Sequence, residues 1–263
     1  MKLGFIGAGN MAGAMMGGIA GAGVIERGDI CAFDIDRDKI EAIENRLGVK
    51  GFSDVDGMIA ACDMIVIAIK PNVVKDAVLK SKSALAGKAV VSIAAGWTTK
   101  ALKDLLDPST RLLRVMPNTP ALCGAGMTAL SVATTFTPAE KEFAQKMFSS
   151  FGLYEWVRED LIDAAVGVSG SGPAYVYMFI EALADAGVSL GLTRAQAVKM
   201  AAQTVKGSAQ MVMDTGKHPG ELKDMVCSPG GTTIEAVRVL ERNGLRSAVM
   251  EAAIAAAEKA KSL

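Results

Sequence analysis

Short apolar runs alternate with helical stretches up to about residue 160. The runs read KLGFIGAG, DICAFDID, MIVIAIKP, KAVVSIAAG, RLLRVMPN, GMTALSVA and LYEWV. The alternation of β-rich runs with helical stretches predicts a parallel sheet with crossover helices. Two of the runs, MIVIAI and AVVSIA, are apolar throughout, as in strands that are covered on both faces. We therefore predict an α/β domain over residues 1–160.

The pattern changes from about Ile162 onward, where long Ala-rich helical stretches follow one another without a convincing strand. These stretches are apolar around much of their circumference, and such helices need burial on several sides. A section of about 100 residues cannot bury them alone, so we predict an all-α domain over residues 161–263 through which subunits associate. Four methionines on these stretches are interpreted as core fillers rather than a ligand surface: Met178, Met200, Met211 and Met213.

The charges of the chain cancel, because 28 Lys plus Arg stand against 28 Asp plus Glu among 263 residues. A net charge of zero gives no reason to expect a nucleic-acid partner. The apolar runs are much shorter than the roughly 20 residues that span a bilayer. The N-terminus lacks the continuous apolar core of a secretory signal. We therefore expect a cytoplasmic protein without a membrane segment.

The four cysteines are widely separated and form no CxxC pair, and the chain has a single histidine, His218. We therefore predict no metal site and interpret the cysteines as reduced structural thiols. The fourth cysteine adjoins the segment SPGGTT, so a reactive thiol there is kept as an alternative. The cysteines are Cys31, Cys62, Cys123 and Cys227.

The segment KLGFIGAGNMAGAM places a G-x-G-x-x-A pattern directly after an apolar strand and before a helix of small residues. In this dinucleotide fingerprint the first glycine allows a tight turn, the second lets the pyrophosphate approach the backbone, and the alanine permits close helix packing. The phosphates would lie at the helix N-terminus. We predict a Rossmann-type dinucleotide-binding domain, with a glycine-rich packing turn as the alternative. The predicted cofactor residues are Gly7, Ala8, Gly9, Asn10, Met11 and Ala12.

Two charged residues after the second predicted strand give opposite indications about the cofactor. Asp34 lies about twenty residues beyond the fingerprint, where a carboxylate commonly accepts from the adenosine ribose 2′-OH and favours NAD. Arg37 follows in the same turn, and its guanidinium suits a 2′-phosphate or stacking on adenine. A solvated Arg37 with a local carboxylate partner is the structural alternative.

Three further predicted strands end in IAIKPN, SIAAG and VMPNTP. Ligands of an open parallel sheet lie beyond the carboxyl ends of its strands. We therefore expect Lys70, Ala95 and Asn118, with their neighbours, to form the rim around a nicotinamide, and Lys70 is the preferred single contact. Ordinary turns are the alternative, because proline and asparagine are common turn residues.

The segment VCSPGGTTIEAV interrupts a helical region, because proline lacks an N–H group and each glycine costs about 1 kcal/mol in a helix. Two explanations fit these residues. The segment is either a loop whose N–H groups are open to a ligand or a plain turn between helices. In the second case Thr232 or Thr233 would be the N-cap of a helix that starts near Ile234.

The segment VGVSGSGPAYVYMFIEA has glycines before a long helix and Pro173 in the first turn of that helix. It is similar to the signature of β-hydroxyacid dehydrogenases, in which the helix carries a lysine that acts on the hydroxyl. The same spacing gives Val176 here, and valine cannot remove the proton that alcohol oxidation requires. Reduction of a C=N bond demands less, because a protonated iminium is already electrophilic and mainly needs orientation.

The fingerprint, the helical second half, SGSGPAY and VCSPGGTTIEA resemble the pyrroline-5-carboxylate reductase family along the whole chain. The SPGGTT segment is the most specific element. The resemblance implies that NADPH or NADH reduces Δ1-pyrroline-5-carboxylate to L-proline. It also implies a Rossmann domain followed by a helical domain that interlocks two subunits, so that the protein is a homodimer or a larger assembly of dimers.

The resemblance implies roles for individual residues. The N–H groups of the SPGGTT segment would hold the substrate carboxylate, and the Thr233 hydroxyl would hydrogen-bond the ring nitrogen and relay a proton from water. Backbone amides near a helix start suit an anion independently of the family. The implied substrate-binding residues are Ser228, Gly230, Gly231, Thr232 and Thr233. The implied cofactor contacts are the fingerprint residues together with Ile69, Lys70 and Ala95.

The sequence leaves two candidate cofactors and more than one candidate function. Many relatives carry Ser or Asn where this chain reads Phe33-Asp34, which weakens the case for NADPH. NADPH is still favoured, on the habit of the family and on Arg37, with NADH as the alternative. The other functions considered are reduction of a related cyclic imine and a regulator that senses a nicotinamide nucleotide.

Overall fold

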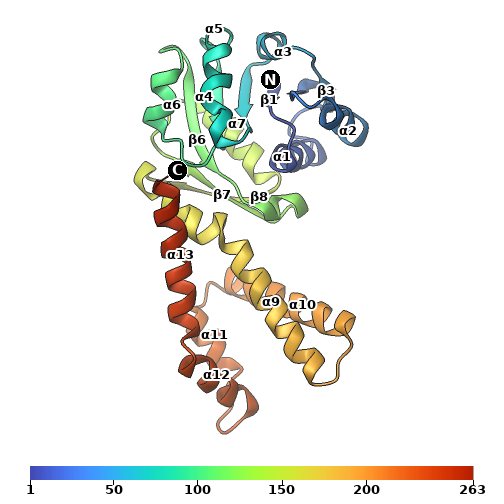
Figure 1. Ribbon diagram of the computed structural model, residues 1–263, viewed down its shortest axis with the longest axis vertical. Helices are drawn as coiled ribbons and strands as arrows, with labels where there is room; N and C mark the ends of the chain where they lie inside the picture. The colour runs from blue at the N-terminus through green and yellow to red at the C-terminus, as the bar shows by residue number, and fades with distance from the viewer. Residues whose placement is uncertain (263) are drawn as a thin grey trace. The chain divides into compact units, whose positions relative to one another are not determined.

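The predicted strands of the first half form one sheet in the computed structural model, which describes residues 1–262 (Figure 1). Eight strands are found in this part of the chain, in the order β3-β2-β1-β4-β5-β6-β7-β8. The strands are β1 Leu3–Ile6, β2 Ile30–Phe33, β3 Lys50–Gly51, β4 Met64–Ile67, β5 Ala89–Ser92, β6 Arg111–Met116, β7 Gly126–Ser131 and β8 Gly152–Val157. Strands β1 to β6 have the order of the Rossmann fold, which confirms the predicted α/β class.

The prediction of a parallel sheet is wrong at one pairing. Strand β7 runs antiparallel to β6, while all other neighbouring strands are parallel. The reason is the connection 117–125, which contains a 3-10 turn and no crossover helix. A parallel return would need a dozen or more residues. The two-residue strand β3 was not predicted, because it is too short to give a pattern.

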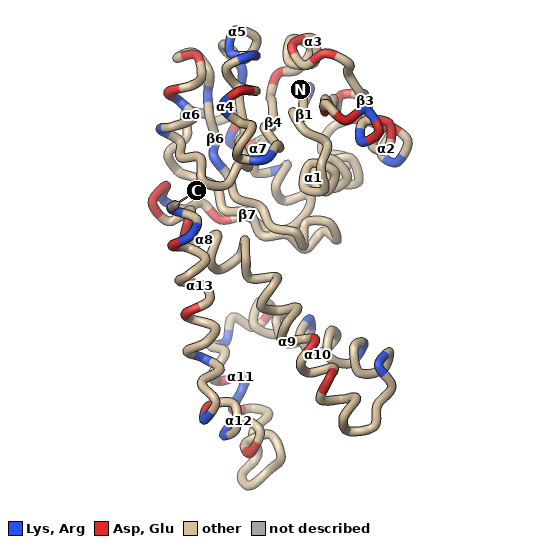
Figure 2. The backbone as a smooth tube through the Cα atoms, in the orientation of Figure 1, with Lys and Arg blue, Asp and Glu red and all other residues tan. Residues whose placement is uncertain are grey.

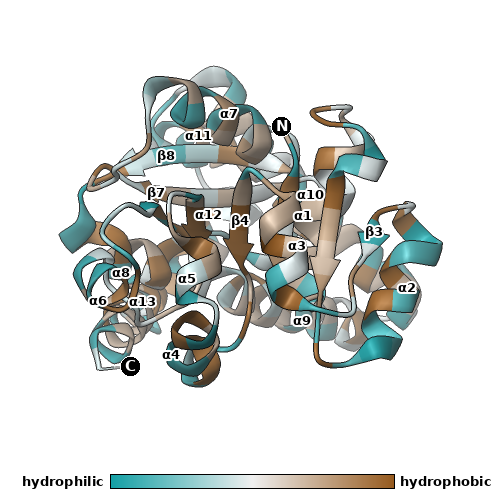
Figure 3. Cartoon of the chain, turned by 90° about the horizontal axis from the view of Figure 1, so that it is seen from above, coloured by the Kyte–Doolittle hydropathy of each residue, from teal (hydrophilic) through white to brown (hydrophobic). Residues whose placement is uncertain are grey.

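Helices cover both faces of the sheet. Alternate strand residues belong to two hydrophobic clusters, since successive side chains of a strand point to opposite faces. Phe5 packs with α1 and α7 in one cluster, and Ile65 packs with α3 and α4 in the other. Figure 3 shows hydrophobic residues along β4, which is fully buried. The helices are α1 Asn10–Gly21, α2 Arg37–Leu47, α3 Val55–Ala61, α4 Pro71–Lys80, α5 Lys82–Leu85, α6 Thr99–Leu105, α7 Pro138–Ser149 and α8 Ile162–Ala165.

Short single turns complete this part of the chain: η1 Arg27–Asp29, η2 Thr119–Cys123, η3 Glu159–Leu161 and the π-helical turn η4 Val166–Gly170. The chain divides into two units, of which the first consists of Met1–Ser171 with a C-terminal segment that begins at Ala255. The second unit is Gly172–Ile254. The sequence analysis placed the boundary after residue 160, whereas the first unit here continues through η3, α8 and η4.

The second unit is helical, and no strand is found beyond Val157 in the residues that the structure describes. The C-terminal helices are α9 Gly172–Ser189, α10 Arg194–Thr215, α11 Pro219–Met225, α12 Thr232–Arg242 and α13 Leu245–Lys261. Helices α9 and α10 pack side by side around a small cluster of Ala184, Ala197 and Ala201. None of the helices described is long and apolar enough to cross a membrane.

The four methionines interpreted as core fillers are not buried within a single chain. Met178 on α9 is 69% exposed and Met213 on α10 is 60% exposed, and Met200 and Met211 are also exposed. Figure 2 shows few charges along α9, whose charged residues are Glu181 and Asp185. The buried cluster of this unit in the described residues is only the small one between α9 and α10, so most of their apolar side chains remain uncovered in one chain.

Candidate functional site

The fingerprint lies where the strand order of the sheet reverses. Strand β1 has β2 on one side and β4 on the other, and open α/β sheets bind ligands at such a point. Gly7 has a φ of 107°, and its N–H group donates to the Phe33 carbonyl at 2.7 Å. A Cβ atom on Gly7 would collide with the Ala68 carbonyl oxygen. The fold itself therefore requires glycine at this position.

Gly9 differs from Gly7, because a Cβ atom on Gly9 would meet no atom within 4 Å. Gly9 is the N-cap of α1, and no side chain in the described part of the protein caps the first turn. The N–H groups near Asn10 and Met11 are therefore open to an anion. Ala12 is 1% exposed and packs into the core. This geometry fits a pyrophosphate at the place that the sequence predicts.

Asp34 is tied to the fingerprint. Its Oδ2 accepts from the Ala8 N–H group at 2.8 Å, and its Oδ1 accepts from the Asp36 N–H group at 2.9 Å. The carboxylate therefore fixes the turn after β2 against the turn after β1. Each oxygen keeps a second lone pair for a ribose hydroxyl. The sequence predicts only the ribose contact, and the contact with Ala8 is an additional structural role.

A cavity of about 400 Å³ opens beside these turns and is lined mainly by apolar side chains. It brings together three of the predicted cofactor residues, namely Gly7, Asp34 and Ile69. The other lining residues are Ile6, Phe33, Ile35, Val55, Val73, Asp76, Ala77, Lys80 and Ser81. An apolar cavity at the switch point suits the adenosine end of a dinucleotide.

Arg37 does not line this cavity. It is the first residue of α2, and its Nη1 donates to the Phe52 carbonyl at 3.2 Å. The structural alternative gave Arg37 a local carboxylate partner, but the ion pairs of the described residues do not include Arg37, and Asp36 pairs with Lys39. The Arg37 guanidinium thus hydrogen-bonds the backbone directly after β3.

Two of the predicted rim positions are connected through a tryptophan that the sequence analysis missed. Lys70 is the N-cap residue of α4 and is exposed. Ala95 lies in residues 93–98 between β5 and α6, which we call the rim loop. Within this loop, the Trp97 Nε1–H group donates to the Pro71 carbonyl at 2.9 Å. The loop that contains Ala95 is therefore tied to the start of α4, beside Lys70.

A buried polar cluster lies directly after the rim loop, at the start of α6. The Glu159 carboxylate accepts from Thr99, Ser131 and Arg114, and Arg114 is only 3% exposed. Burial raises the pKa of Glu159, but the hydrogen bonds from Ser131, Thr99 and the Arg114 guanidinium lower this pKa by more than burial raises it. The pKa of Glu159 therefore lies below its ordinary value, and the carboxylate is charged at neutral pH.

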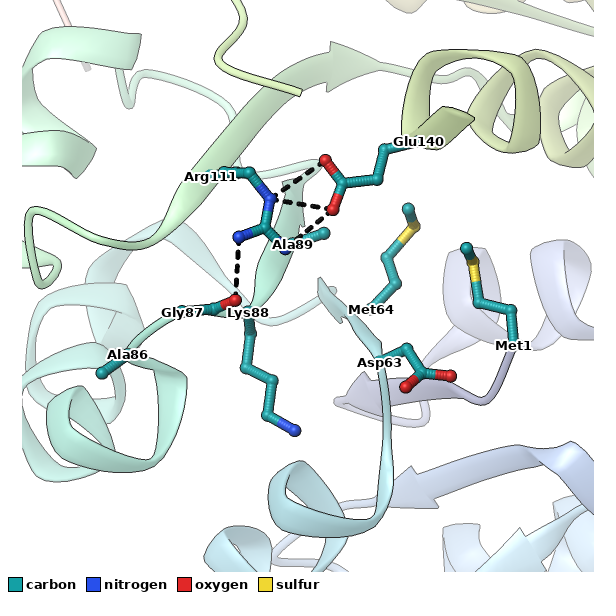
Figure 4. A pocket seen from close by; sticks show the side chains of 9 residues that line it. All are labelled: Met1, Asp63, Met64, Ala86, Gly87, Lys88, Ala89, Arg111 and Glu140. Atoms are coloured by element: carbon teal, nitrogen blue, oxygen red, sulfur yellow. Dashed lines mark hydrogen bonds and ion pairs between the residues drawn. The ribbon is translucent and has the colours of Figure 1, made fainter. Parts of the chain in front are cut away.

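A second cavity, of about 310 Å³, lies at the opposite edge of the sheet (Figure 4). It is lined by residues where β4, β5 and β6 begin, including Arg111 and Glu140. Arg111 Nε donates to Glu140 at 2.8 Å, and Arg111 Nη1 donates to the Gly87 carbonyl at 2.9 Å. These polar groups are already paired with each other, and the predicted site residues lie elsewhere. The cavity is therefore not the candidate site.

The SPGGTT segment, residues 228–233, consists of a turn and the first two residues of α12, and we call this segment the substrate loop. Gly230 has a φ of 67°, a conformation that favours glycine. The Gly231 N–H group donates to the Ser228 carbonyl at 3.0 Å, and a Cβ atom on Gly231 would collide with Ser228 Oγ. The two glycines therefore serve different steric needs of one tight turn.

The plain-turn alternative for the substrate loop is wrong about the helix cap. Helix α12 begins at Thr232, its N-cap is Gly231, and no side-chain hydrogen bond caps it among the residues described. Thr232 and Thr233 lie inside the helix and leave its first N–H groups open. Thr233 is half-buried, whereas Thr232 is exposed. An uncapped helix start of this kind suits a carboxylate.

The remaining residues singled out in the sequence lie in helices, at a helix cap or as free thiols. Pro173 is the second residue of α9, as predicted, and α9 contains no lysine, arginine or histidine. Val176 on α9 is 41% exposed. His218 is the N-cap of α11, where its Nδ1 accepts from the Gly220 N–H group. The four cysteines are free, with Cys31 and Cys62 buried, Cys123 exposed and Cys227 half-buried.

The fold and these sites define the class of the protein as a nicotinamide-dependent oxidoreductase with a Rossmann domain and a helical C-terminal half. Residues 2–96 match the family model described as "NADP oxidoreductase coenzyme F420-dependent". Residues 159–263 match the model described as "Pyrroline-5-carboxylate reductase dimerisation".

Full-length relatives identify the family. The pyrroline-5-carboxylate reductase of Escherichia coli K12 is 47% identical over 263 residues, which cover 100% of this chain and 98% of that protein. The structure of the Coxiella burnetii enzyme is 36% identical, with a TM-score of 0.92 over 99% of this chain and 97% of that one. The Plasmodium falciparum enzyme, solved with NADP bound, is 34% identical, with a TM-score of 0.90 over 100% and 97%. The chain belongs to the pyrroline-5-carboxylate reductase family.

Proposed function

We propose that the protein reduces the C=N bond of Δ1-pyrroline-5-carboxylate to give L-proline, the last step of proline synthesis. The observation that carries this proposal is the match along the whole chain, which includes both the fingerprint and the substrate loop. When bound, NADPH or NADH supplies a hydride to the imine carbon. The residues of the chain bind the cofactor and the substrate, orient them toward each other and supply a proton to the ring nitrogen.

The substrate loop is proposed to hold the carboxylate of the substrate. The N–H groups of Gly230 and Thr232 would bind its oxygens together with the Ser228 hydroxyl, while the Gly231 N–H group closes the turn on the Ser228 carbonyl. The exposed and uncapped start of α12 supports this role, because unpaired N–H groups and the positive end of a helix attract an anion. The half-buried Thr233 is proposed as the catalytic residue, whose hydroxyl hydrogen-bonds the ring nitrogen and relays a proton from water.

The cofactor is proposed to lie along the carboxyl edge of the sheet. The fingerprint residues would bind the pyrophosphate, the cavity beside Asp34 and Ile69 would hold the adenosine, and Lys70 and Ala95 would border the nicotinamide. The open space at Gly9 and the uncapped start of α1 support this arrangement.

The choice between NADPH and NADH depends on the charges near the adenosine. The sequence favours NADPH through Arg37 and the habit of the family, but the side-chain positions favour NADH. The carboxylates of Asp34 and Asp76 line the cavity, and Lys80 is the one cationic residue among its lining residues. The Arg37 guanidinium hydrogen-bonds the Phe52 carbonyl instead. A 2′-phosphate would be repelled by Asp34, whereas a 2′-hydroxyl can donate to it. We therefore propose a preference for NADH.

Calorimetry with NAD⁺ and NADP⁺ tests the cofactor preference. We expect tighter binding of NAD⁺ by the wild type. Asp34→Asn should strengthen the binding of NADP⁺ by about tenfold, because it removes one charge, worth about 1.4 kcal/mol, and keeps an acceptor for Ala8. Asp56→Asn, on the exposed first turn of α3, is the control. Tighter NADP⁺ binding by the wild type would contradict the preference for NADH.

The assembly and the location are also proposals. We propose a homodimer or a larger assembly of dimers, built through the second unit, and this is supported by the dimerisation model and the exposed apolar faces of α9 and α10. A cytoplasmic location is supported by the free cysteines, because disulfides are rare in reducing compartments.

The rate of oxidation of NADH and NADPH with Δ1-pyrroline-5-carboxylate tests the function. Thr233→Ala should lower kcat/KM at least tenfold, or about 1.4 kcal/mol of transition-state stabilisation. Thr204→Ala on α10, outside the substrate loop, should leave the rate unchanged. A wild type that binds dinucleotide tightly but shows no turnover with either cofactor would reject the reductase and favour the nucleotide-sensing regulator.

A further inference from the structure

The rim loop, residues 93–98, is held by side-chain contacts at its C-terminal end and directly after it. Toward its C-terminal end, the Trp97 Nε1–H group donates to the Pro71 carbonyl at 2.9 Å. Immediately after the loop, the Thr99 N–H group donates to Glu159 Oε1 at 2.8 Å, and the Thr99 hydroxyl donates to Glu159 Oε2 at 2.9 Å. The C-terminal end of the loop that contains Ala95 is therefore attached, through Thr99, to a carboxylate sixty residues beyond Thr99.

Glu159 collects donors from three different elements. Besides the two from Thr99 on α6, Ser131 Oγ on β7 donates to Oε2 at 2.5 Å, and Arg114 Nη1 on β6 donates to Oε1 at 2.9 Å. Each carboxylate oxygen thus accepts two hydrogen bonds. Thr99, Ser131 and Arg114 are all buried. Because charge-assisted hydrogen bonds are strong when buried, this carboxylate fixes the three elements relative to one another.

The start of α6 does not need Glu159 for its own cap. Thr98 is the N-cap, and its hydroxyl accepts from the Ala101 N–H group at 3.1 Å. The contact between Thr99 and Glu159 is therefore additional to ordinary helix capping. Its effect is to set where the rim loop enters α6.

The neighbouring strand end is tied to the same stretch of chain. The Asn118 side chain, after β6, donates to the Ser169 carbonyl at 2.9 Å and accepts from the Met127 N–H group at 2.8 Å. Asn118 is 8% exposed. Arg114 also contacts Asp163 at 3.3 Å. Two successive rim segments are thus anchored on residues 159–170, which we call the junction segment.

We propose that Glu159 is a positioning residue that holds the rim loop, and with it Ala95, in the place that nicotinamide binding requires. The inference rests on the proposed function only in assigning the nicotinamide to this rim. Glu159 does not contact the cofactor in this account and acts through Thr99. Loss of the Glu159 carboxylate should therefore weaken binding of the nicotinamide half of the cofactor and leave binding of the adenosine half unchanged.

The test compares Glu159→Gln with Glu140→Gln. Glutamine at 159 keeps the size of the side chain but turns one acceptor into a donor that faces other donors. Glu140 is the matched control, because its carboxylate also pairs with an arginine of the sheet, Arg111, but at the opposite edge (Figure 4). Thr99→Val and Thr99→Ser form a second pair, since only serine keeps the hydroxyl that donates to Glu159.

Calorimetry with NADH and with ADP-ribose, which lacks the nicotinamide, gives a readout that does not need turnover. In Glu159→Gln and Thr99→Val we expect the affinity ratio of NADH to ADP-ribose to fall about tenfold, while the affinity for ADP-ribose stays within about twofold. We expect kcat/KM to fall by a similar factor. Glu140→Gln and Thr99→Ser should keep the ratio of the wild type.

An unchanged ratio in both Glu159→Gln and Thr99→Val would overturn the inference, as would an equal loss in Glu140→Gln. Should Glu159→Gln fail to fold, the two Thr99 variants decide alone. A wild type without turnover on Δ1-pyrroline-5-carboxylate would reject the proposed function, and the affinity ratios would still decide whether Glu159 positions the rim loop.

Discussion

At the scale of single residues, the two fingerprint glycines should fail in different ways when each is replaced by alanine. Gly7→Ala places a Cβ against the Ala68 carbonyl at a φ of 107°, so we expect a loss of at least about 2 kcal/mol in the free energy of unfolding. Gly9→Ala meets open space, so its stability should change by less than about 0.5 kcal/mol. Its affinity for NAD⁺ should nevertheless fall. Urea unfolding and calorimetry measure both effects, and equal stability of the two variants would contradict this assignment.

Glu159 should also contribute to the pH dependence of stability. Burial raises its pKa, but the hydrogen bonds from Ser131 and Thr99 and the Arg114 guanidinium bring the net value below the ordinary 4.5. A lowered carboxyl pKa gives stability that is present above the unfolded pKa and is lost as the pH falls through the folded pKa. Between pH 5 and 3, the wild type should therefore lose stability more steeply than Glu159→Gln, by at most about 1.4 kcal/mol per pH unit. Urea denaturation at each pH measures the free energy of unfolding. The same dependence of this free energy on pH in both proteins would refute this contribution.

The sequence predicts site residues where the signal is local. Gly7, Gly9 and Ala12 fall within six positions and follow a strand, so their pattern can be recognised. Glu159 gives no such signal, because its donors Thr99 and Ser131 are 60 and 28 residues away in the chain. Such contacts depend on the order of the strands in the sheet, and no periodic pattern encodes them.

At the scale of elements, the substrate loop and α12 should respond to the shape of their turn. Gly231→Ala directs a Cβ at Ser228 Oγ, so the hydroxyl must move, and we expect KM for Δ1-pyrroline-5-carboxylate to rise about tenfold. Gly230→Asn should raise this KM less, because asparagine tolerates the left-handed conformation. Calorimetry should show unchanged binding of NAD⁺ in both. A weaker NAD⁺ affinity in Gly231→Ala would argue against a separate substrate loop.

The elements predicted from apolar runs are the described strands other than β3 and the two long helices α9 and α10. The direction of β7 could not be predicted, because it depends on the absence of a crossover helix in residues 117–125. The plain-turn alternative placed the cap of α12 at a threonine, which is a usual residue type there. The turn instead places Gly231 at the cap, and both threonines lie within the helix.

At the scale of the whole molecule, the second unit leaves apolar side chains without cover. We expect sedimentation velocity to show a dimer or a larger assembly, and Met178→Lys on α9 to shift it toward the monomer, because a lysine charge resists burial. Leu153→Lys on β8, which is 55% exposed in the first unit, is the control and should leave the assembly unchanged. A monomeric wild type would contradict association through the second unit.

The central claim is that hydride reaches the imine carbon of Δ1-pyrroline-5-carboxylate. The most direct measurement is turnover with NADH that carries deuterium at the transferred position of C4, followed by NMR of the product. We predict L-proline with deuterium at C5. No proline, or proline without deuterium at C5, would contradict the account.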